Sequence, residues 1–269
     1  MPEGPEIRRA ADRVQAAVAR QPLEVELHVP SLAGRELEGR TITHVETRGK
    51  AMLTHFEGGP VLYSHNQLYG RWYVVRRGTS PRTSRSLRVA FHAPKKSAML
   101  YSATELEWLS PDALDAHPFL AKLGPDLLAP TTTIDAIDAR LSERRFARRA
   151  LASLYLDQGF LAGLGNYLRA EILFVAGLHP SRRPGELDAS RRRALAEATL
   201  EVTLRSYRTG GVTIDARREA GLVEEGVPRR ARRHYVYGRA GHACRLCETP
   251  IERVELGGRH VFVCPRCQG

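Results

Sequence analysis

The sequence is poor in three things: cysteine, which is absent before position 244; lysine, of which there are four in 269 residues; and long hydrophobic stretches. No run of 18 apolar residues is present, so no membrane-spanning helix is predicted. The first ten residues, MPEGPEIRRA, carry charges where a secretory signal has an apolar segment, and we therefore expect a cytoplasmic protein with no membrane partner. Hydrophobic residues make up 42% of the chain and are spread along it, which excludes a disordered protein and is typical of a globular one.

Positive charge is in excess and is unevenly distributed. Lys and Arg total 41 against 30 Asp and Glu, which gives a formal net charge of +11. Residues 1–130 account for +3 of this charge and residues 131–269 for +8. Basic clusters of this kind suit the phosphate backbone of nucleic acid. They also fit the ordinary solvated surface of a protein from an Arg-rich proteome, because 37 of the 41 basic residues are Arg. Charge alone makes nucleic acid a candidate partner without identifying it.

All four cysteines lie in the last 26 residues and form two C-x2-C pairs separated by sixteen residues: Cys244, Cys247, Cys264 and Cys267. Each pair can present two thiolates from one turn, and four thiolates close a tetrahedral zinc site. Disulfides or free thiols are the alternatives, and a cytosolic setting disfavours disulfides. A four-thiolate site has no open position, so one structural zinc ion that folds a β-hairpin is predicted. The hairpin carries Arg259 near its tip, after Gly257 and Gly258.

Hydrophobic periodicity predicts an α+β chain. Apolar residues recur at helical spacing over 5–19, and short β-branched and aromatic segments separated by Gly, Pro and Ser follow between 23 and 102. We interpret these segments as an antiparallel β-sandwich or barrel. Short helices are expected over 103–123, and further helices over 134–207.

Three domains follow from this pattern. The stretch GPDLLAPTTT, residues 124–133, is the best candidate for a linker, and the Gly-rich, charged residues 208–233 are expected to form an irregular, mobile loop. We predict an N-terminal domain over 1–124, a helical domain over 125–233 and the zinc hairpin over 234–269. No phosphate-binding loop or dinucleotide motif is present, so nucleotide-cofactor chemistry is not predicted.

The first residues can carry chemistry of their own. Removal of Met1 would leave Pro2 with a free secondary amine, whose pKa is expected near the α-amino value of about 7.7–8.0. Such an amine is partly unprotonated at neutral pH and can attack a sugar carbon at the aldehyde level to give a cationic iminium. Glu3 and Glu6 lie beside it as candidate acids or bases. By themselves, however, these residues favour a simpler interpretation, in which they only start a helix.

Five blocks of sequence occur in an order that resembles a known family: MPEGPEIRRA, TRGKAMLTHF, SHNQLYG, DQGFLAGLGNYLRAEIL, and YVYGRAGHAC with the terminal CPRCQ. Together they reach from the first residue to the last cysteine, and they resemble the formamidopyrimidine-DNA glycosylase family. The resemblance implies a bifunctional DNA glycosylase and AP lyase of base excision repair, acting on double-stranded DNA with a damaged base or an abasic site. It also implies a helix–two-turn–helix element in the helical domain, and we expect a monomer.

The resemblance assigns catalytic roles by position. Pro2 matches the family's amine nucleophile, Glu3 the acid that assists opening of the sugar ring, and Glu6 a supporting carboxylate. Lys50 matches a lysine placed near the sugar and phosphate, although on its own it would be interpreted as an exposed turn lysine. Arg259 matches the arginine that grips phosphates beside the lesion and contributes to the second elimination.

Other residues match DNA contacts. Gln67, Leu68 and Tyr69 match the wedge that fills the space left by a flipped nucleotide, whereas core packing is the ordinary interpretation of such a trio. Asn166 follows two glycines at a helix start and matches a backbone-phosphate contact, although a plain corner between helices fits the residues equally well. Lys122 aligns with a basic contact that is more commonly Arg, so it would keep the charge but lose bidentate geometry.

The resemblance implies cleavage by β,δ-elimination. Two features are similar to the members of the family that act on oxidised pyrimidines: the opening GPEI at 4–7 and the contiguous wedge. The same chemistry on oxidised purines is the alternative, because YVYGR at 235–239 resembles the purine enzymes. A third possibility is a non-catalytic, zinc-dependent DNA-binding protein. Such a protein would be expected to lack Pro2, Glu3 or Lys50, and all three are present.

Overall fold

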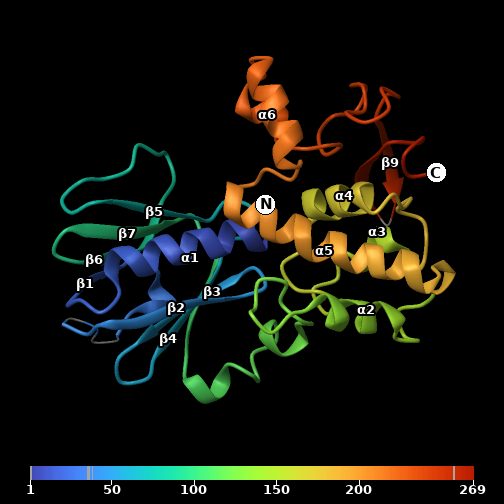
Figure 1. Ribbon diagram of the computed structural model, residues 1–269. Helices are drawn as coiled ribbons and strands as arrows, with labels where there is room; N and C mark the ends of the chain where they lie inside the picture. Colours follow the sequence, from blue (N-terminus) through green and yellow to red (C-terminus); the bar gives the residue numbers. More distant parts are fainter. Residues whose placement is uncertain (1, 35–36, 38, 257) are drawn as a thin grey trace. The chain divides into compact units, whose positions relative to one another are not determined.

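The computed structural model describes residues 2–34, 37, 39–256 and 258–269. The chain forms two compact units, Met1–Leu123 and Gly124–Gly269. Figure 1 shows the first as one long helix with strands and the second as mainly helical, with a short hairpin near the C-terminus. The predicted α+β class is confirmed.

The first unit begins with α1 (Gly4–Val18), which confirms the helix predicted from periodicity. Its residues Ile7, Ala11, Val14 and Val18 are all buried, because apolar residues three or four positions apart share one face of a helix. Glu3 is the N-cap residue, and a proline in the first turn costs no hydrogen bond because that turn has no intrahelical acceptor for its N–H.

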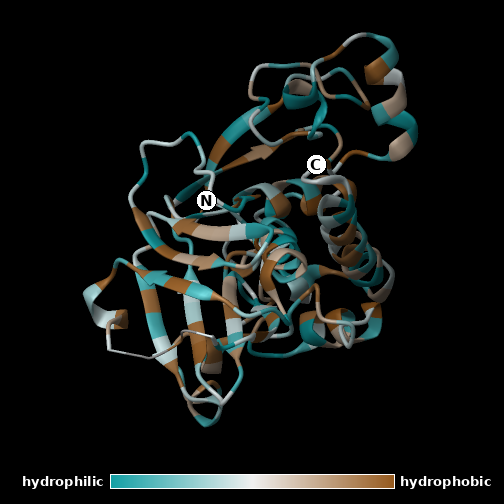
Figure 2. Ribbon diagram, turned by 90° about the vertical axis from the view of Figure 1, so that its left-hand side faces the viewer, coloured by the Kyte–Doolittle hydropathy of each residue, from teal (hydrophilic) through white to brown (hydrophobic). Residues whose placement is uncertain are grey.

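Two four-stranded antiparallel sheets complete this unit, in the orders β2-β3-β4-β8 and β1-β6-β7-β5. Their strands are β1 (Glu24–Leu27), β2 (Ile42–Arg48), β3 (Ala51–Phe56), β4 (Val61–His65), β5 (Arg71–Arg76), β6 (Leu87–His92), β7 (Lys96–Tyr101) and β8 (Glu105–Leu109). Hydrophobic and hydrophilic residues alternate along several strands (Figure 2). Val14 of α1, Leu62 of one sheet and Phe91 of the other share one core. The antiparallel sandwich is therefore confirmed.

The expectation of helices throughout 103–123 is wrong in part, because Glu105–Leu109 form β8. This strand pairs with β4, and the Trp108 Nε1–H donates a hydrogen bond to Leu32 O at 3.1 Å. Two short 3-10 turns follow, η2 (Pro111–Ala113) and η3 (Leu120–Lys122). The Glu and Leu residues of Glu105–Leu109 (ELEWL) favour a helix by themselves. These residues form a strand instead because they pair with β4, which lies 40 or more residues earlier in the chain.

The second unit is built around α4 (Asn166–Val175) and α5 (Ala189–Thr209). Leu168, Leu195 and Val202 of these helices lie in one buried core. Asp188 caps α5 by accepting a backbone N–H at 2.8 Å, and Gly210, with a φ of 73°, ends it in the left-handed conformation that favours glycine. The other elements before α5 are α2 (Ile134–Ser142), α3 (Leu151–Leu154) and the 3-10 turn η4 (Pro184–Glu186). No helix in the described part of the chain is long and apolar enough to cross a membrane.

Residues 208–233 are not irregular, contrary to expectation. α5 continues through Thr209, and α6 (Ala216–Glu224) and α7 (Arg229–Arg232) follow. Asp215 caps α6 by accepting the Arg218 N–H at 2.9 Å. None of its residues is fully buried, although the partly buried Leu222 packs against the core of the hairpin, and its N-cap aspartate is the local signal for its start.

β9 (Glu252–Leu256) and β10 (Arg259–Val263) form an antiparallel hairpin between the two cysteine pairs, as the zinc-hairpin prediction requires. Gly257, part of the predicted tip, lies outside the described residues. Val261 and Val263 of β10 share a buried core with Phe174 of α4. The hydrophobic core of the hairpin therefore includes a side chain of α4. The hairpin depends on that helix as well as on the ion that its cysteines bind.

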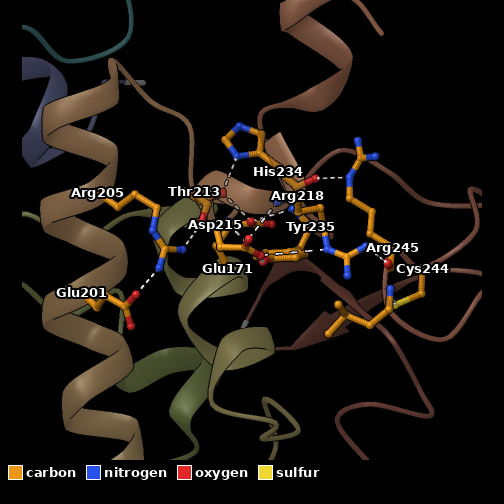
Figure 3. A network of polar contacts seen from close by, with 11 residues as sticks. Glu171, Glu201, Arg205, Thr213, Asp215, Arg218, His234, Tyr235, Cys244 and Arg245 are labelled. Atoms are coloured by element: carbon orange, nitrogen blue, oxygen red, sulfur yellow. Dashed lines mark hydrogen bonds and ion pairs between the residues drawn. The ribbon is translucent and has the colours of Figure 1, made fainter. Parts of the chain in front are cut away.

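Glu171 of α4 is fully buried and fixes the segment that leads into the hairpin (Figure 3). Its carboxylate accepts a hydrogen bond from Thr213 Oγ1 at 2.5 Å and three from consecutive backbone N–H groups: Tyr235 at 2.7 Å, Val236 at 2.8 Å and Tyr237 at 2.8 Å. Thr213 and Tyr235 flank the segment that contains α6 and α7. One carboxylate therefore holds both ends of that segment.

Replacing this carboxylate by an amide should destabilise the protein. In Glu171→Gln one acceptor oxygen becomes a donor, which leaves buried N–H groups facing an NH2 group. We expect a loss of about 3 kcal/mol in the free energy of unfolding, measured by urea denaturation of the zinc-bound protein. The control is Glu201→Gln, an exposed carboxylate paired with Arg205, whose effect should stay within about 0.5 kcal/mol. Equal, small losses in both variants would contradict the role of Glu171.

Candidate functional site

The start of α1 places a buried carboxyl group beside Pro2. Glu3 is 3% exposed, and Pro2 is partly exposed. Glu3 and Glu6 form a capping box, in which Glu6 Oε2 accepts the backbone N–H of Glu3 at 3.0 Å. Glu6 thus fixes the backbone that carries Glu3. Met1 lies outside the described residues, so its removal stays a prediction.

Lys50 lies in the tight turn between β2 and β3. Arg48 and Ala51 pair across the turn, and Gly49 has a φ of 61°, which a residue without a Cβ adopts easily. The Lys50 side chain is not on the surface as an ordinary turn lysine would be, because the residue is only 9% exposed. Its positive charge acts on His65, the last residue of β4, which pairs with Ala51.

His65 is buried at the end of β4. Burial lowers the pKa of His65 below its usual value, Glu105 opposes this shift, and the positive charge of Lys50 adds to it. His65 Nδ1 accepts the backbone N–H of Gln67 at 3.1 Å, so the neutral imidazole supports the next turn. The side-chain amide of Gln67 also donates a hydrogen bond, to the carboxylate of Glu105.

The turn after β4 presents two apolar side chains to solvent. Leu68 is 62% exposed and Tyr69 is 66% exposed, which excludes core packing as the role of this trio. Gly70 N–H donates to Asn66 O at 2.7 Å, and a Cβ on Gly70 would lie 2.6 Å from that same oxygen. Gln67, with a φ of 48°, completes a tight turn that only glycine at position 70 permits. Exposed apolar side chains on a tight turn are suited to insertion into a partner.

In the second unit, Asn166 is the first residue of α4, after the N-cap Gly165. Its Oδ1 accepts a hydrogen bond from Arg169 Nη2 at 2.5 Å. Arg169 is fully buried and also donates to Ala152 O at 2.7 Å and to His260 O at 2.9 Å. One buried guanidinium therefore connects the start of α4 with α3 and with the hairpin strand that begins at the exposed Arg259.

Arg169 and Glu171 were not predicted as functional residues. Both lie in a helix whose other inward positions are apolar, and both are 0% exposed. Charged residues at positions that periodicity assigns to the core are the only signal the sequence offers for them.

Lys122, the last residue of η3, is exposed in the first unit.

The four cysteines fit a tetrahedral ion. They are unpaired, and three Sγ–Sγ distances are Cys244–Cys267 at 3.9 Å, Cys247–Cys264 at 3.4 Å and Cys247–Cys267 at 3.4 Å. Four sulfur atoms at about 2.3 Å from a zinc ion lie about 3.8 Å from one another in a tetrahedron, which is close to these distances. A hydrogen bond from Thr249 lowers the pKa of Cys247 to about 6, whereas burial raises that of Cys267. A divalent cation would hold all four as thiolates.

Three family models match the chain along its length. The formamidopyrimidine-DNA glycosylase N-terminal domain matches residues 1–104, and the H2TH domain of the same family matches residues 123–218. A zinc finger found in FPG and IleRS matches residues 241–269. The predicted helix–two-turn–helix element and the single structural zinc ion are confirmed.

Similar proteins agree with these matches. Endonuclease 8 of Escherichia coli (strain UMN026) is 46% identical over 271 residues, and Endonuclease 8 of Klebsiella pneumoniae is 45% identical; each comparison covers 100% of both chains. Lactococcus lactis Fpg has the same fold. Its complex with THF-DNA and an inhibitor gives a TM-score of 0.80 at 22% identity, covering 100% of both chains. Its complex with DNA containing an abasic site gives a TM-score of 0.80 at 22% identity, and the comparison covers 99% of both chains.

Removing the zinc ion should unfold the hairpin selectively. We expect residues 244–269 to lose protection from amide hydrogen exchange in chelator, while the strands of the first unit keep theirs, because only the hairpin depends on the ion. Added Zn2+ should restore protection and added Mg2+ should not. Unchanged protection of the hairpin in metal-free protein would contradict its dependence on zinc.

Acid should weaken the turn after β4. Because the pKa of folded His65 is lowered, the unfolded chain takes up a proton first as the pH falls below the ordinary value of 6.5. The stability that neutral His65 contributes is therefore complete above pH 6.5 and is lost on acidification through the folded pKa. NMR titration of the His65 imidazole should give a pKa below 6.5. The backbone N–H of Gln67 should exchange faster with solvent as His65 becomes protonated. A value of 6.5 or higher would contradict this.

Proposed function

Because the chain belongs to the formamidopyrimidine-DNA glycosylase family, we propose that Pro2 is the amine with which it removes oxidised pyrimidines from DNA. The chain is a bifunctional DNA glycosylase and AP lyase of base excision repair. Its partner is double-stranded DNA with a damaged base or an abasic site, and the solved Lactococcus lactis Fpg complexes hold abasic-site DNA. The observation that carries the proposal is the buried carboxyl group of Glu3 beside Pro2 at the positive end of α1.

The glycosylase step replaces one bond at C1′ by another. The unprotonated Pro2 nitrogen attacks C1′ of the flipped nucleotide, and the base leaves with the electron pair of the glycosidic bond. The attached Pro2 nitrogen gives up its proton, which the departing base takes up, and Glu3 gives a proton to the ring oxygen O4′. The C1′–O4′ bond breaks, and C1′ and the Pro2 nitrogen form a cationic iminium. Glu6 acts indirectly, because it holds the backbone N–H of Glu3.

The lyase steps use the iminium as an electron sink. Loss of a proton from C2′ expels the phosphate on C3′, and a second elimination expels the phosphate on C5′. The product is a one-nucleotide gap with phosphate at both ends. Lys50 is a buried ammonium on a tight turn, which supports its assignment near the sugar and phosphate. Arg259 is proposed to assist the second elimination.

Extrusion of the damaged nucleotide needs a replacement in the stack. Unstacking and unpairing cost a few kcal/mol, which inserted apolar side chains can offset. The exposure of Leu68 and Tyr69 on a turn fixed by Gly70 supports their assignment as the wedge. Gln67 is held by His65 and Glu105 and would contribute a polar contact.

The backbone contacts are proposed for Asn166, Lys122 and Arg259. The Oδ1 atom of Asn166 accepts from Arg169, so its Nδ2–H groups are the donors that it can offer to a phosphate oxygen. Arg259 precedes His260, whose carbonyl Arg169 also holds. Lys122 is exposed and supplies charge without bidentate geometry.

The domain boundaries, the assembly and the location complete the proposal. We propose catalytic, helical and zinc-finger domains over 1–124, 125–233 and 234–269. The division of the structure after Leu123 and the ranges of the matched family models support them. The protein is proposed to act as a monomer in the bacterial cytoplasm, and its bacterial relatives support this location.

Trapping with borohydride tests the amine mechanism. Reduction of the iminium should link the protein covalently to a duplex with an abasic site. A form extended by one residue before Pro2, whose nitrogen is then an amide, should give no adduct while it still binds the duplex. Undiminished trapping of the extended form would contradict catalysis by Pro2.

A panel of duplexes tests the substrate class. Strand cleavage should be faster with thymine glycol or dihydrouracil than with 8-oxoguanine, and an abasic site should be cleaved irrespective of the base. The segment 235–239, which resembles the purine enzymes, makes oxidised purines the second candidate. Faster cleavage at 8-oxoguanine would overturn the pyrimidine assignment without affecting the amine mechanism.

A further inference from the structure

Two histidines and a glutamate lie together on β2 and β3, apart from every residue assigned above. His44 and His55 are cross-strand partners, and Glu46 lies two residues along β2 from His44, so the three side chains share one face. A register shift between Ile42 and His44 leaves Thr43 as an extra residue on this edge strand, and such bulges often re-aim the side chains beside them.

The three side chains are already close. The imidazole rings of His44 and His55 stack with centroids 4.0 Å apart and planes 14° apart. His55 Nε2 lies 3.2 Å from Glu46 Oε1. One ligand atom from each of the three lies within 4.8 Å of the other two. Ligand bonds of about 2.0–2.2 Å to one ion need neighbouring ligand atoms about 3–3.5 Å apart, so His55 and Glu46 already meet this requirement and His44 needs a small rotation.

Thr43 fixes which nitrogen of His44 has a free electron pair. The Thr43 hydroxyl donates to His55 O at 3.2 Å, so its oxygen accepts from His44 Nδ1–H at 3.1 Å. This arrangement places the proton on Nδ1 and the electron pair on Nε2. Metal-binding histidines are commonly oriented in this way, by a hydrogen bond from the nitrogen that does not bind the ion.

The charges around the group also suit a cation. Glu46 supplies a negative charge beside the two rings, and the hydrogen bond from His55 lowers the pKa of its carboxyl group. The opposing charge is Arg48, whose Nε lies 3.4 Å from Glu46 Oε1. Arg48 has a second partner in Asp115, at 3.0 Å, to which it can turn.

We propose that His44, Glu46 and His55 bind one divalent transition-metal ion, such as zinc or nickel, at a site separate from the four cysteines. Nε2 of His44, Nε2 of His55 and one oxygen of Glu46 are the ligands, and water completes the coordination. The ion takes the place of the proton on His55 Nε2, which moves to Nδ1 of the same ring, so the bound imidazole stays neutral. Two imidazoles and a carboxylate with open positions are a donor set for zinc or nickel rather than for calcium or magnesium.

Calorimetric titration of Zn2+ into protein whose cysteine site already holds zinc tests the proposal. One additional site is expected, which binds one zinc ion per protein molecule. Affinity should fall as the pH drops below about 6.5, where imidazoles protonate. His55→Ala should abolish binding, and Glu46→Gln and His44→Ala should each weaken it at least tenfold.

The matched control is a second His–Glu contact in the same unit. Glu26 lies 3.3 Å from His28 Nε2 and 3.0 Å from His92 Nε2, through different carboxylate oxygens. These three residues do not form a compact ligand group in the described part of the chain. Binding should therefore be unchanged in His28→Ala, and circular dichroism should show that each variant is folded. Absence of a second zinc ion at millimolar Zn2+, or its persistence in folded His55→Ala, would overturn the proposal.

Discussion

The second unit depends on two opposite charges buried on one turn of α4. Arg169 and Glu171 are both fully buried, and a buried charge without partners costs several kcal/mol. Each charge therefore requires its partners to be in place. Arg169 donates to acceptors on α3, α4 and β10, and Glu171 accepts four hydrogen bonds from residues that flank α6 and α7. The start of α4, the segment after α5 and the zinc hairpin are thereby held by a single helix.

This constraint bears directly on the proposed DNA contacts. Asn166 and the strand that begins with Arg259 are attached to the same guanidinium, although they are more than 90 residues apart in the sequence. Zinc closes the hairpin on itself, and Arg169 and the core shared with Phe174 fix it to the helix. In the first unit a buried carboxyl group at the start of α1 and a buried lysine on a tight turn provide the proposed chemistry. Near that lysine, a turn fixed by glycine presents Leu68 and Tyr69 to solvent.

The sequence predicted the features whose causes are local. Helical spacing located α1, and two C-x2-C pairs predicted the zinc hairpin. Features that depend on distant partners were missed: β8 forms because it pairs with β4, and α6 packs against the core of the hairpin through the partly buried Leu222. Arg169 and Glu171 bond to residues as far as 91 and 66 positions away, which no local pattern reveals. The exposure of Leu68 and Tyr69 likewise follows from the turn at Gly70 rather than from their spacing. The roles of Pro2, Glu3 and Lys50 came from the family resemblance, because their residue types alone fit a helix start and a surface turn.

The central claim is that the reactive group of this chain is a backbone nitrogen and not a side chain. Peptide mapping by mass spectrometry of the borohydride-reduced adduct with abasic DNA tests it most directly. The account predicts that the sugar remnant is attached to the nitrogen of Pro2, in a peptide that begins at that residue and lacks Met1. Attachment to Lys50, or to any other side chain, would contradict it.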